Sequence, residues 1–389
     1  MASFVRIGAR LRHWRTTRGL TQRELGRLLG YDATYLSKIE NDARPAPPDL
    51  PKRCDEVLET GGELAALSAQ SSRGRDGGPQ RRGHDAGSAD DAAAVFDSLL
   101  EEHARTARLL GGVSVVRAVE EQIPVIVGWA GEAPEATARR LLGVASRYAD
   151  LAGWLRHDCG DPRSAGVWFR RAHWWAESSG DAELASCCLA DSSCLAWREG
   201  DAVAAVDYAR AAQRVGAGQP LALARGLLAE ARGLGLAGEA HAAALRLDRA
   251  ERALASGDAA DSQTPSPQLA ENILRYTSGL CHRDLAARGC RTSARRAVDE
   301  LRAAARTFPF DNRLDETILE LRLAEAYACA GELDAAVATI EVAYPAASVM
   351  RSYRIRRELR RARGRLGEQW ESAPQLRRLD ELIQAAART

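Results

Sequence analysis

A Gly-Asp pair recurs every 20 residues in the middle of the chain, at 160–161, 180–181 and 200–201. A glycine can end a helix in the left-handed conformation, and an aspartate can cap the first turn of the next one. Similar pairs follow at 238–239, 257–258 and 331–332. This punctuation predicts helices of about 15 residues joined by tight turns.

Composition agrees with a helical chain. Ala, Leu, Arg and Glu dominate the 389 residues, and no segment alternates apolar and polar residues as a half-buried strand does. We therefore expect an all-α fold. Two helices make a unit of about 40 residues, so residues 92–389 hold roughly seven helical hairpins. Small or apolar side chains recur at i, i+4 and i+7, where paired helices must approach closely: Ala165, Phe169 and Ala172, then Ala205, Ala209 and Ala212.

The N-terminal region has a different pattern. Thr21 and Glu24 have the spacing of a capping box, and Gly30 ends the helix that they begin. Asp32 is placed to cap the helix that follows. We expect Leu25, Leu28 and Leu29 to be buried in the first of these helices, and Leu36 and Ile39 in the second. The second helix then presents small and polar side chains outward, as a helix entering the major groove of DNA requires.

Charge is distributed unevenly between this region and the rest. The chain carries a net charge of +1, but residues 1–53 hold eleven Lys and Arg against five Asp and Glu. A small basic region on a mildly acidic body indicates that the basic part meets a polyanion.

The sequence T-Q-x-E-L-x-x-x-x-G and the later L-S-K-I-E-N, within residues 4–69, resemble the helix-turn-helix domain of the phage repressor and Cro (xenobiotic-response-element) family. The resemblance implies a five-helix DNA-binding domain over residues 1–69. It also implies that Arg15 and Glu40 form a buried ion pair, as in some family members.

The resemblance also assigns DNA contacts. Gln22 is implied to contact phosphate and orient the recognition helix, while Thr34 and Lys38 read bases. Ser37 is implied to touch a base or the backbone. The full set of expected DNA-binding residues is Gln22, Arg23, Ala33, Thr34, Ser37, Lys38, Asn41 and Arg44. Ala33 departs from members that carry Gln there, so it offers only a methyl contact.

Residues 70–91 are rich in Gly, Ser and charge and predict a flexible linker. Residues 92–389 then resemble a degenerate tetratricopeptide array, an α-solenoid that forms a concave groove. Asn272, Arg275 and Tyr276 fall on a helix expected to line that groove, and Trp154 begins a cluster of tryptophans. These four are candidate ligand contacts; core packing for Trp154 and a surface position for Asn272 are the alternatives.

Two further features stay open between a structural and a functional interpretation. Cys187 and Cys194 lie two turns apart on one helix face, as buried small residues or as part of a redox or metal cluster with His157 or His173. Residues 351–365 hold eight Arg and one Glu, which suits an exposed basic face, an intersubunit face, an acidic partner or extra DNA contact.

The sequence therefore predicts a transcriptional regulator that binds double-stranded operator DNA, senses a peptide or small molecule through its repeats, and forms a homodimer. The alternative is a protein-interaction scaffold tethered to DNA without a small ligand. We find no catalytic, cofactor or metal motif and no membrane span, and expect neither an enzyme nor a cofactor. Abundant Ala, Arg and Gly with little Lys, and cysteines without a disulfide pattern, favour the cytoplasm of a GC-rich bacterium.

Overall fold

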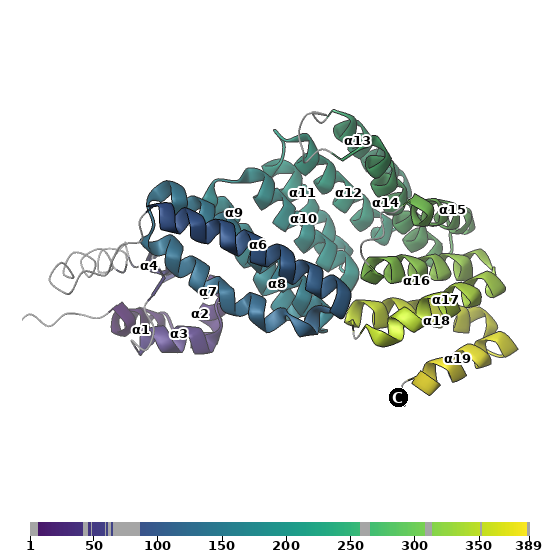
Figure 1. Cartoon of the computed structure of the whole chain (residues 1–389), viewed down its shortest axis with the longest axis horizontal. Helices are drawn as coiled ribbons and strands as arrows, with labels where there is room; N and C mark the ends of the chain where they lie inside the picture. Colours follow the sequence, from purple (N-terminus) through teal and green to yellow (C-terminus); the bar gives the residue numbers. More distant parts are fainter. Residues whose placement is uncertain are drawn as a thin grey trace, which may run out of the picture. The chain divides into compact units, whose positions relative to one another are not determined.

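The computed structural model describes residues 7–41, 46–47, 49–58, 60, 64, 86–256, 265–307, 313–350 and 352–386. These residues form 18 α-helices and one short 3-10 helix, with no strand among them (Figure 1). The prediction of an all-α fold, a helix-turn-helix region followed by a long helical region, is confirmed. The chain divides into two compact units: Met1–Ala92 with Val127–Ala138, and Ala93–Ile126 with Arg139–Thr389.

The N-terminal region holds α1 (Ile7–Thr17), α2 (Gln22–Leu29), α3 (Ala33–Glu40) and α4 (Leu50–Leu58). Its core consists of Leu11, Leu25, Leu29, Leu36, Ile39, Leu50, Cys54, Leu58 and Leu64. The prediction that Leu28 belongs to this core is wrong, because its side chain is 58% exposed. Gly26 shares the buried face with Leu25 and Leu29 instead. The fifth helix expected near Leu64 otherwise lies outside the described residues.

The body begins with α6 (Ala86–Leu110), the 3-10 helix Gly112–Ser114, α7 (Val116–Glu132), α8 (Glu135–Asp158), α9 (Pro162–Ser179) and α10 (Ala182–Glu199). It continues with α11 (Ala202–Val215), α12 (Pro220–Ala237), α13 (Ala240–Ala255), α14 (Pro267–Ala287) and α15 (Arg291–Thr307). The last helices are α16 (Arg313–Ala330), α17 (Leu333–Val349), α18 (Tyr353–Trp370) and α19 (Pro374–Ala386).

The expected linker needs a correction at its C-terminal end. Residues 70–85 lie outside the described residues, but 86–91 are the first residues of α6 rather than linker. A run of alanines follows Asp91, and alanine has the highest helix propensity, so the helix extends back through the polar residues before it.

The Gly-Asp turns form as predicted. Gly160, Gly180 and Gly200 have φ of 83°, 81° and 88°, the left-handed conformation in which a side chain is strained. Each following aspartate accepts a hydrogen bond from a backbone N–H three residues on, as Asp161 does from Ser164 at 3.0 Å. Gly238 and Gly331 also adopt positive φ, while 257–258 lie outside the described residues.

The repeat of about 40 residues is visible in individual hydrogen bonds. The Ser146 hydroxyl donates to the backbone oxygen of Ala172 at 2.8 Å, and Ser186, 40 residues later, donates to Ala212 at 2.9 Å. Ala172 and Ala212 are fully buried, as are the other four residues predicted at close-approach positions. Small side chains thus let the two helices of a hairpin meet closely enough for a serine to bond the partner's backbone.

The even-numbered helices from α10 to α18 form one continuous row, since each packs on the next even-numbered helix. The end of this row returns to its beginning. Arg354 of α18 pairs with Asp158 of α8 at 2.5 Å, and Ser352 donates to the same carboxylate at 3.0 Å. Arg357 of α18 pairs with Glu199 of α10. The row therefore curves back so that α18, its last helix, contacts α8 and α10; we call these contacts the α18 clasp.

A buried charge network continues the α18 clasp inward. Glu358 of α18 accepts from Arg322 of α16 at 2.7 Å and lies 3.4 Å from Arg283 of α14. Arg283 also pairs with Asp284 at 2.9 Å. Both arginines are essentially inaccessible, at 0% and 1% exposure.

The arginine-rich segment is therefore not the exposed basic face that the sequence allowed. Acidic side chains of the same chain form ion pairs with four of its arginines: Arg354, Arg357, Arg361 and Arg363. Among the arginines of α18, only Arg356 and Arg360 are exposed. Sequence position alone could not show this, because the acidic partners lie up to about 200 residues earlier in the chain.

We predict that Glu358→Ala lowers the free energy of unfolding by about 3–5 kcal/mol, because it leaves Arg283 and Arg322 buried beside an incomplete set of carboxylates. Burial alone would raise the pKa of Glu358, but Arg322 and Arg283 hold it well below its usual range. Its contribution is thus present above the pKa of the unfolded chain and is lost on acidification. Urea denaturation at pH 7 and at pH 3 measures both effects, with exposed Arg360→Ala as the unaffected control.

Candidate nucleic-acid interface

The turn between α2 and α3 is fixed by caps on both sides. Thr21 accepts from the Glu24 N–H at 3.2 Å, while the Glu24 carboxylate accepts from the Thr21 N–H at 2.7 Å, so the predicted capping box is present. Gly30 ends α2 with φ of 73°, and Asp32 caps α3 by accepting from the Thr34 N–H at 2.7 Å. These contacts set the direction of α3 relative to α2.

Gly26 makes the same turn possible through its missing side chain. A Cβ atom at this position would lie 2.4 Å from the backbone oxygen of Tyr31, which is inside any allowed contact. The Tyr31 N–H donates to the Gly26 oxygen at 2.8 Å. The two rings that follow, Tyr31 and Tyr35, stack with their centroids 5.0 Å apart. Sequence reasoning missed Gly26, although a glycine inside a short helix is costly enough to indicate a packing role.

The end of α3 is held by a buried ion pair. Arg15 of α1 donates to both oxygens of Glu40, at 2.5 and 2.9 Å, and also to the backbone oxygen of Leu20. Gln22 donates to Glu40 at 2.7 Å. Burial alone would raise the pKa of Glu40, but the hydrogen bonds from Arg15 and Gln22 hold it below its usual value. One carboxylate therefore joins α1, the start of α2 and the end of α3.

The outward face of α3 carries the residues expected to read DNA. Thr34, Lys38 and Asn41 are exposed at i, i+4 and i+7 and so lie on one side of the helix, with Ala33 and Ser37 half-buried beside them. A stripe of this size suits base edges in the major groove. Arg23 is exposed in the first turn of α2, whereas Arg44 lies outside the described residues.

Two predicted phosphate contacts are already engaged within the protein. The Gln22 amide nitrogen is used by Glu40, which gives Gln22 the orienting contact implied by the resemblance; its phosphate contact stays a prediction. Asn41 accepts from Arg12 and donates to the Ser37 backbone oxygen at 2.9 Å. Arg12, which the sequence analysis missed, thus lies beside the end of α3 with 48% of its side chain exposed. Its position adds a positive charge to the candidate interface.

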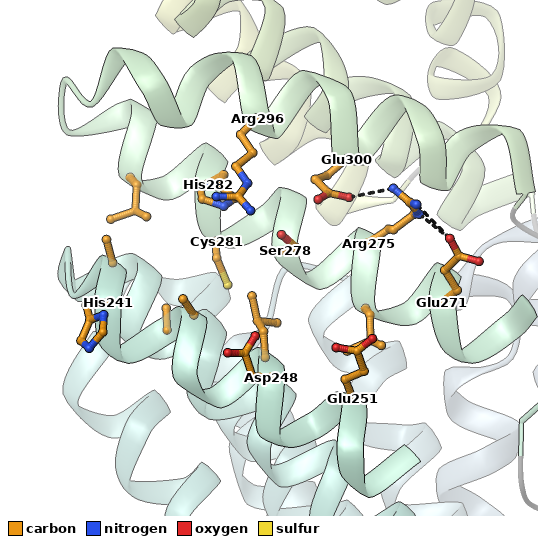
Figure 2. A pocket seen from close by; sticks show the side chains of 16 residues that line it. His241, Asp248, Glu251, Glu271, Arg275, Ser278, Cys281, His282, Arg296 and Glu300 are labelled. Carbon is orange, nitrogen blue, oxygen red and sulfur yellow. Dashed lines mark hydrogen bonds and ion pairs between the residues drawn. The ribbon is translucent and has the colours of Figure 1, made fainter. Parts of the chain in front are cut away.

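The four candidate ligand contacts of the body do not converge on one site. Asn272 is buried and its amide donates to the Thr307 backbone oxygen at 2.7 Å, so it joins α14 to α15 instead of lining a groove. Arg275 lines a cavity of about 620 Å³ between α13, α14 and α15, where it pairs with Glu271 and Glu300 (Figure 2).

Tyr276 and Trp154 lie on the inner side of the even-numbered row. The Tyr276 hydroxyl contacts Arg322, and its ring lies under the same guanidinium. Trp154 packs edge-on against Phe169 with centroids 5.2 Å apart, and Arg198 and Arg354 lie over its ring. These contacts agree with the alternative interpretation of Trp154 as a residue of the packed core.

The cysteine alternatives can also be compared with the structure. Cys188 and Cys194 are buried and Cys187 is half-buried, and these cysteines are free thiols. No group of three or more His, Cys, Asp or Glu side chains in the described part of the chain is arranged to hold a metal ion. No helix among the described residues is long and apolar enough to cross a membrane.

We predict that Glu40→Ala destabilises α3 by about 3 kcal/mol, because Arg15 is left buried without its carboxylate. Since the pKa of Glu40 is lowered by folding, its contribution is lost as the pH falls below about 4.5, its ordinary pKa. Amide hydrogen exchange of α3 in the full chain measures the loss. Glu56→Ala, an exposed acidic residue of α4, should leave the exchange unchanged; equal exchange in both variants would show that the ion pair contributes little.

Comparison with known protein families gives a match in the N-terminal region. A family model described as a helix-turn-helix domain matches residues 6–67, which include all of α1 to α4. No curated protein matches the chain. The capped α2–α3 turn, its buried ion pair and this family match agree that the N-terminal part of the chain is a helix-turn-helix domain.

Proposed function

We propose that this chain is a sequence-specific DNA-binding regulator of transcription that works in the bacterial cytoplasm. The observation that carries the proposal is the exposed stripe of Thr34, Lys38 and Asn41 on a helix held against α1 and α2 through Glu40. A rigid helix with small polar and cationic side chains is what base reading in the major groove requires. In this proposal Thr34 and Lys38 read bases, Ser37 and Ala33 contribute close contacts, and Arg23, Gln22, Asn41 and Arg44 contact the backbone.

The proposal includes a homodimer. One recognition helix contacts about four or five base pairs, which gives too small a specificity ratio against a genome of competing sites. Two half-sites one helical turn apart, read by two copies, roughly square that ratio. We expect a palindromic operator for this reason.

For the body we propose a sensor with a tetratricopeptide-like architecture. The 40-residue repeat of the Ser146 and Ser186 contacts supports a stack of equivalent hairpins. A cavity of about 250 Å³ lies between α10, α12 and α14. A cavity of this size favours a small molecule over an extended peptide or a broad scaffold surface. A catalytic role has no motif to support it, and we propose none.

Selection of fragmented source-genome DNA by the purified full-length protein, followed by sequencing, tests the proposal. Enrichment of a palindrome with half-sites about ten base pairs apart is the expected result. Retention of DNA without sequence preference, with a steep dependence on salt, would contradict it in favour of general DNA binding.

We predict that Thr34→Ala or Lys38→Ala weakens binding to the selected operator by about 1–3 kcal/mol and relaxes its sequence preference, because each removes a base contact. Lys52→Ala is the matched control, since Lys52 is an exposed lysine of α4 in the same domain. Titration of labelled operator and of a scrambled duplex at one salt concentration separates the two effects. If all three variants lose the same affinity for both duplexes, α3 does not read the sequence.

A further inference from the structure

Three arginines on the inner side of the body have no carboxylate partner. Arg198 belongs to α10, and Arg225 and Arg232 belong to α12. Within the described part of the chain none of them forms an ion pair. The Nε atoms of Arg198 and Arg232 are buried and have no hydrogen-bond partner.

Other arginines of the body are treated differently. Arg283 and Arg322 are buried against carboxylates, and Arg354 pairs with Asp158. Even Arg275, in the open cavity of Figure 2, lies between Glu271 and Glu300. The three inner arginines differ from these in lacking a carboxylate partner. Arg198 and Arg232 are half-buried, and a charge partly removed from water without a counter-charge is unfavourable.

The guanidinium groups of these three arginines contact thiols and indole rings, whereas the other arginines named above contact carboxylates. Arg225 donates to the Cys187 sulfur at 3.0 Å, and Arg232 to the Cys194 sulfur at 3.5 Å. These two pairs have the same sequence separation and line the same cavity. Arg198 lies over the ring of Trp154, with its guanidinium carbon 5.5 Å from the centroid. Burial raises the pKa of the Cys187 thiol, whereas Arg232 and Arg198 lower that of Cys194 against the effect of burial. A protonated thiol or an indole does not neutralise a guanidinium as an anion does.

The nearest acidic groups supply at most one negative charge near neutral pH. Burial raises the pKa of Asp191 to about 6, although Arg225 and Arg232 oppose the shift. Asp150 of α8 has a pKa well above its usual range because of burial and the charge of Asp191, and its Oδ1 atom is buried without a partner. The two carboxyl groups therefore hold a proton between them near neutral pH, which leaves the guanidinium charges in excess.

The cavity that these groups line has a mixed character. Its volume is about 250 Å³, and Ala190, Leu228 and Ile273 give it an apolar wall, while Tyr276 and Thr277 contribute from α14. Such a space is large enough for a small organic molecule with one ring or a short chain.

We propose that this cavity is a binding site for a small organic anion, whose carboxylate or phosphate group is held by Arg225 and Arg232 while its apolar part lies against Leu228 and Ile273. The bound oxyanion supplies the counter-charge that the two guanidinium groups lack. Asp191 faces the same space, and below about pH 6, where it is protonated, it can donate a hydrogen bond to the anion.

Three probes of similar size test the site in the full-length protein: benzoate, phenyl phosphate and the neutral benzamide. Isothermal titration should show saturable binding of at least one anion and none of benzamide. The tighter of the two anions identifies the head group. No saturable binding of either anion, or equal binding of benzamide, would overturn the proposal.

Variants locate the site. Arg232→Met and Arg225→Met should each weaken anion binding by about tenfold or more, since each removes one charged donor. Arg275→Met, which changes an ion-paired arginine of α14 outside this cavity, is the matched control and should bind as the wild type does. Arg225 is exposed, so its variant should fold even if Arg232→Met does not. Unchanged affinity in Arg225→Met would overturn the assignment.

Stability gives a second readout that a structural role would not produce. Without a ligand, Arg232→Met should melt at a higher temperature than the wild type, because a half-buried guanidinium without an ion pair is replaced by an apolar chain. Saturating anion should raise the melting temperature of the wild type by more than that of the variant. A destabilised Arg232→Met protein that still binds the anion would contradict the proposal.

The pH dependence of anion binding follows from the ionisation of Asp191. The titratable and charged groups that face it are Asp150 of α8, Arg198 of its own helix, Arg225 and Arg232 of α12, and Tyr276 of α14. Anion affinity should fall as the pH rises through about 6, where Asp191 becomes charged, and Asp191→Asn should remove this fall. An identical pH profile in that variant would exclude Asp191 from the site.

This site deepens the sensing role proposed above, but its test uses no DNA. If the anion binds and no operator is selected, the regulatory proposal fails and the site stands. If an operator is selected and no anion binds, the reverse holds.

Discussion

The close approach of paired helices at small side chains is the constraint on which the body depends. Ser146 and Ser186 can bond the backbone of the next helix only because Ala172 and Ala212 offer no bulk there. Gly153 of α8 lies at another close approach to α9, where no side chain fits, because a Cβ on Gly153 would lie 2.6 Å from the Phe169 ring. Repetition of this contact gives the two helices of successive hairpins the same close spacing, and stacking of such equivalent hairpins forms the row of inner helices.

Curvature then brings together charges that are far apart in the sequence. Arg354 reaches Asp158, and Glu358 lies between arginines of α14 and α16. The same inner side holds both arginines with full counter-charges and the three without them. In the N-terminal domain Glu40 has a comparable role on a smaller scale, since it joins three helices through Arg15 and Gln22.

Local signals were sufficient to predict much of this molecule. The Gly-Asp turns, the Thr21–Glu24 capping box and the Asp32 cap depend on residues within four positions of one another, and each formed as expected. Predictions that depended on which face of a helix is buried differ from the structure at two positions. Leu28 is exposed because Gly26 takes the buried position, and Asn272 bonds Thr307 because its face of α14 meets α15.

In the body, the long-range ion pairs could not be predicted from the sequence. The arginine-rich segment of 351–365 was left open between several interpretations, because its partners, Asp158 and Glu199, are identified only once the row curves back on itself. The unpaired state of Arg232 was equally hidden, since nothing in the sequence distinguishes it from Arg322. Burial and pairing of a charge are properties of the folded chain, and composition records only its presence.

The α18 clasp has a consequence for how the body comes apart. An open stack of hairpins unfolds piecemeal from its ends, because each hairpin contacts only its neighbours. Ion pairs between Arg354 and Asp158 and between Arg357 and Glu199 connect α18 to α8 and α10, so this end of the array cannot fray independently of those earlier helices. The linear array thereby acquires the cooperativity of a closed ring, and loss of a single carboxylate at the junction would return it to the behaviour of a chain of separate links.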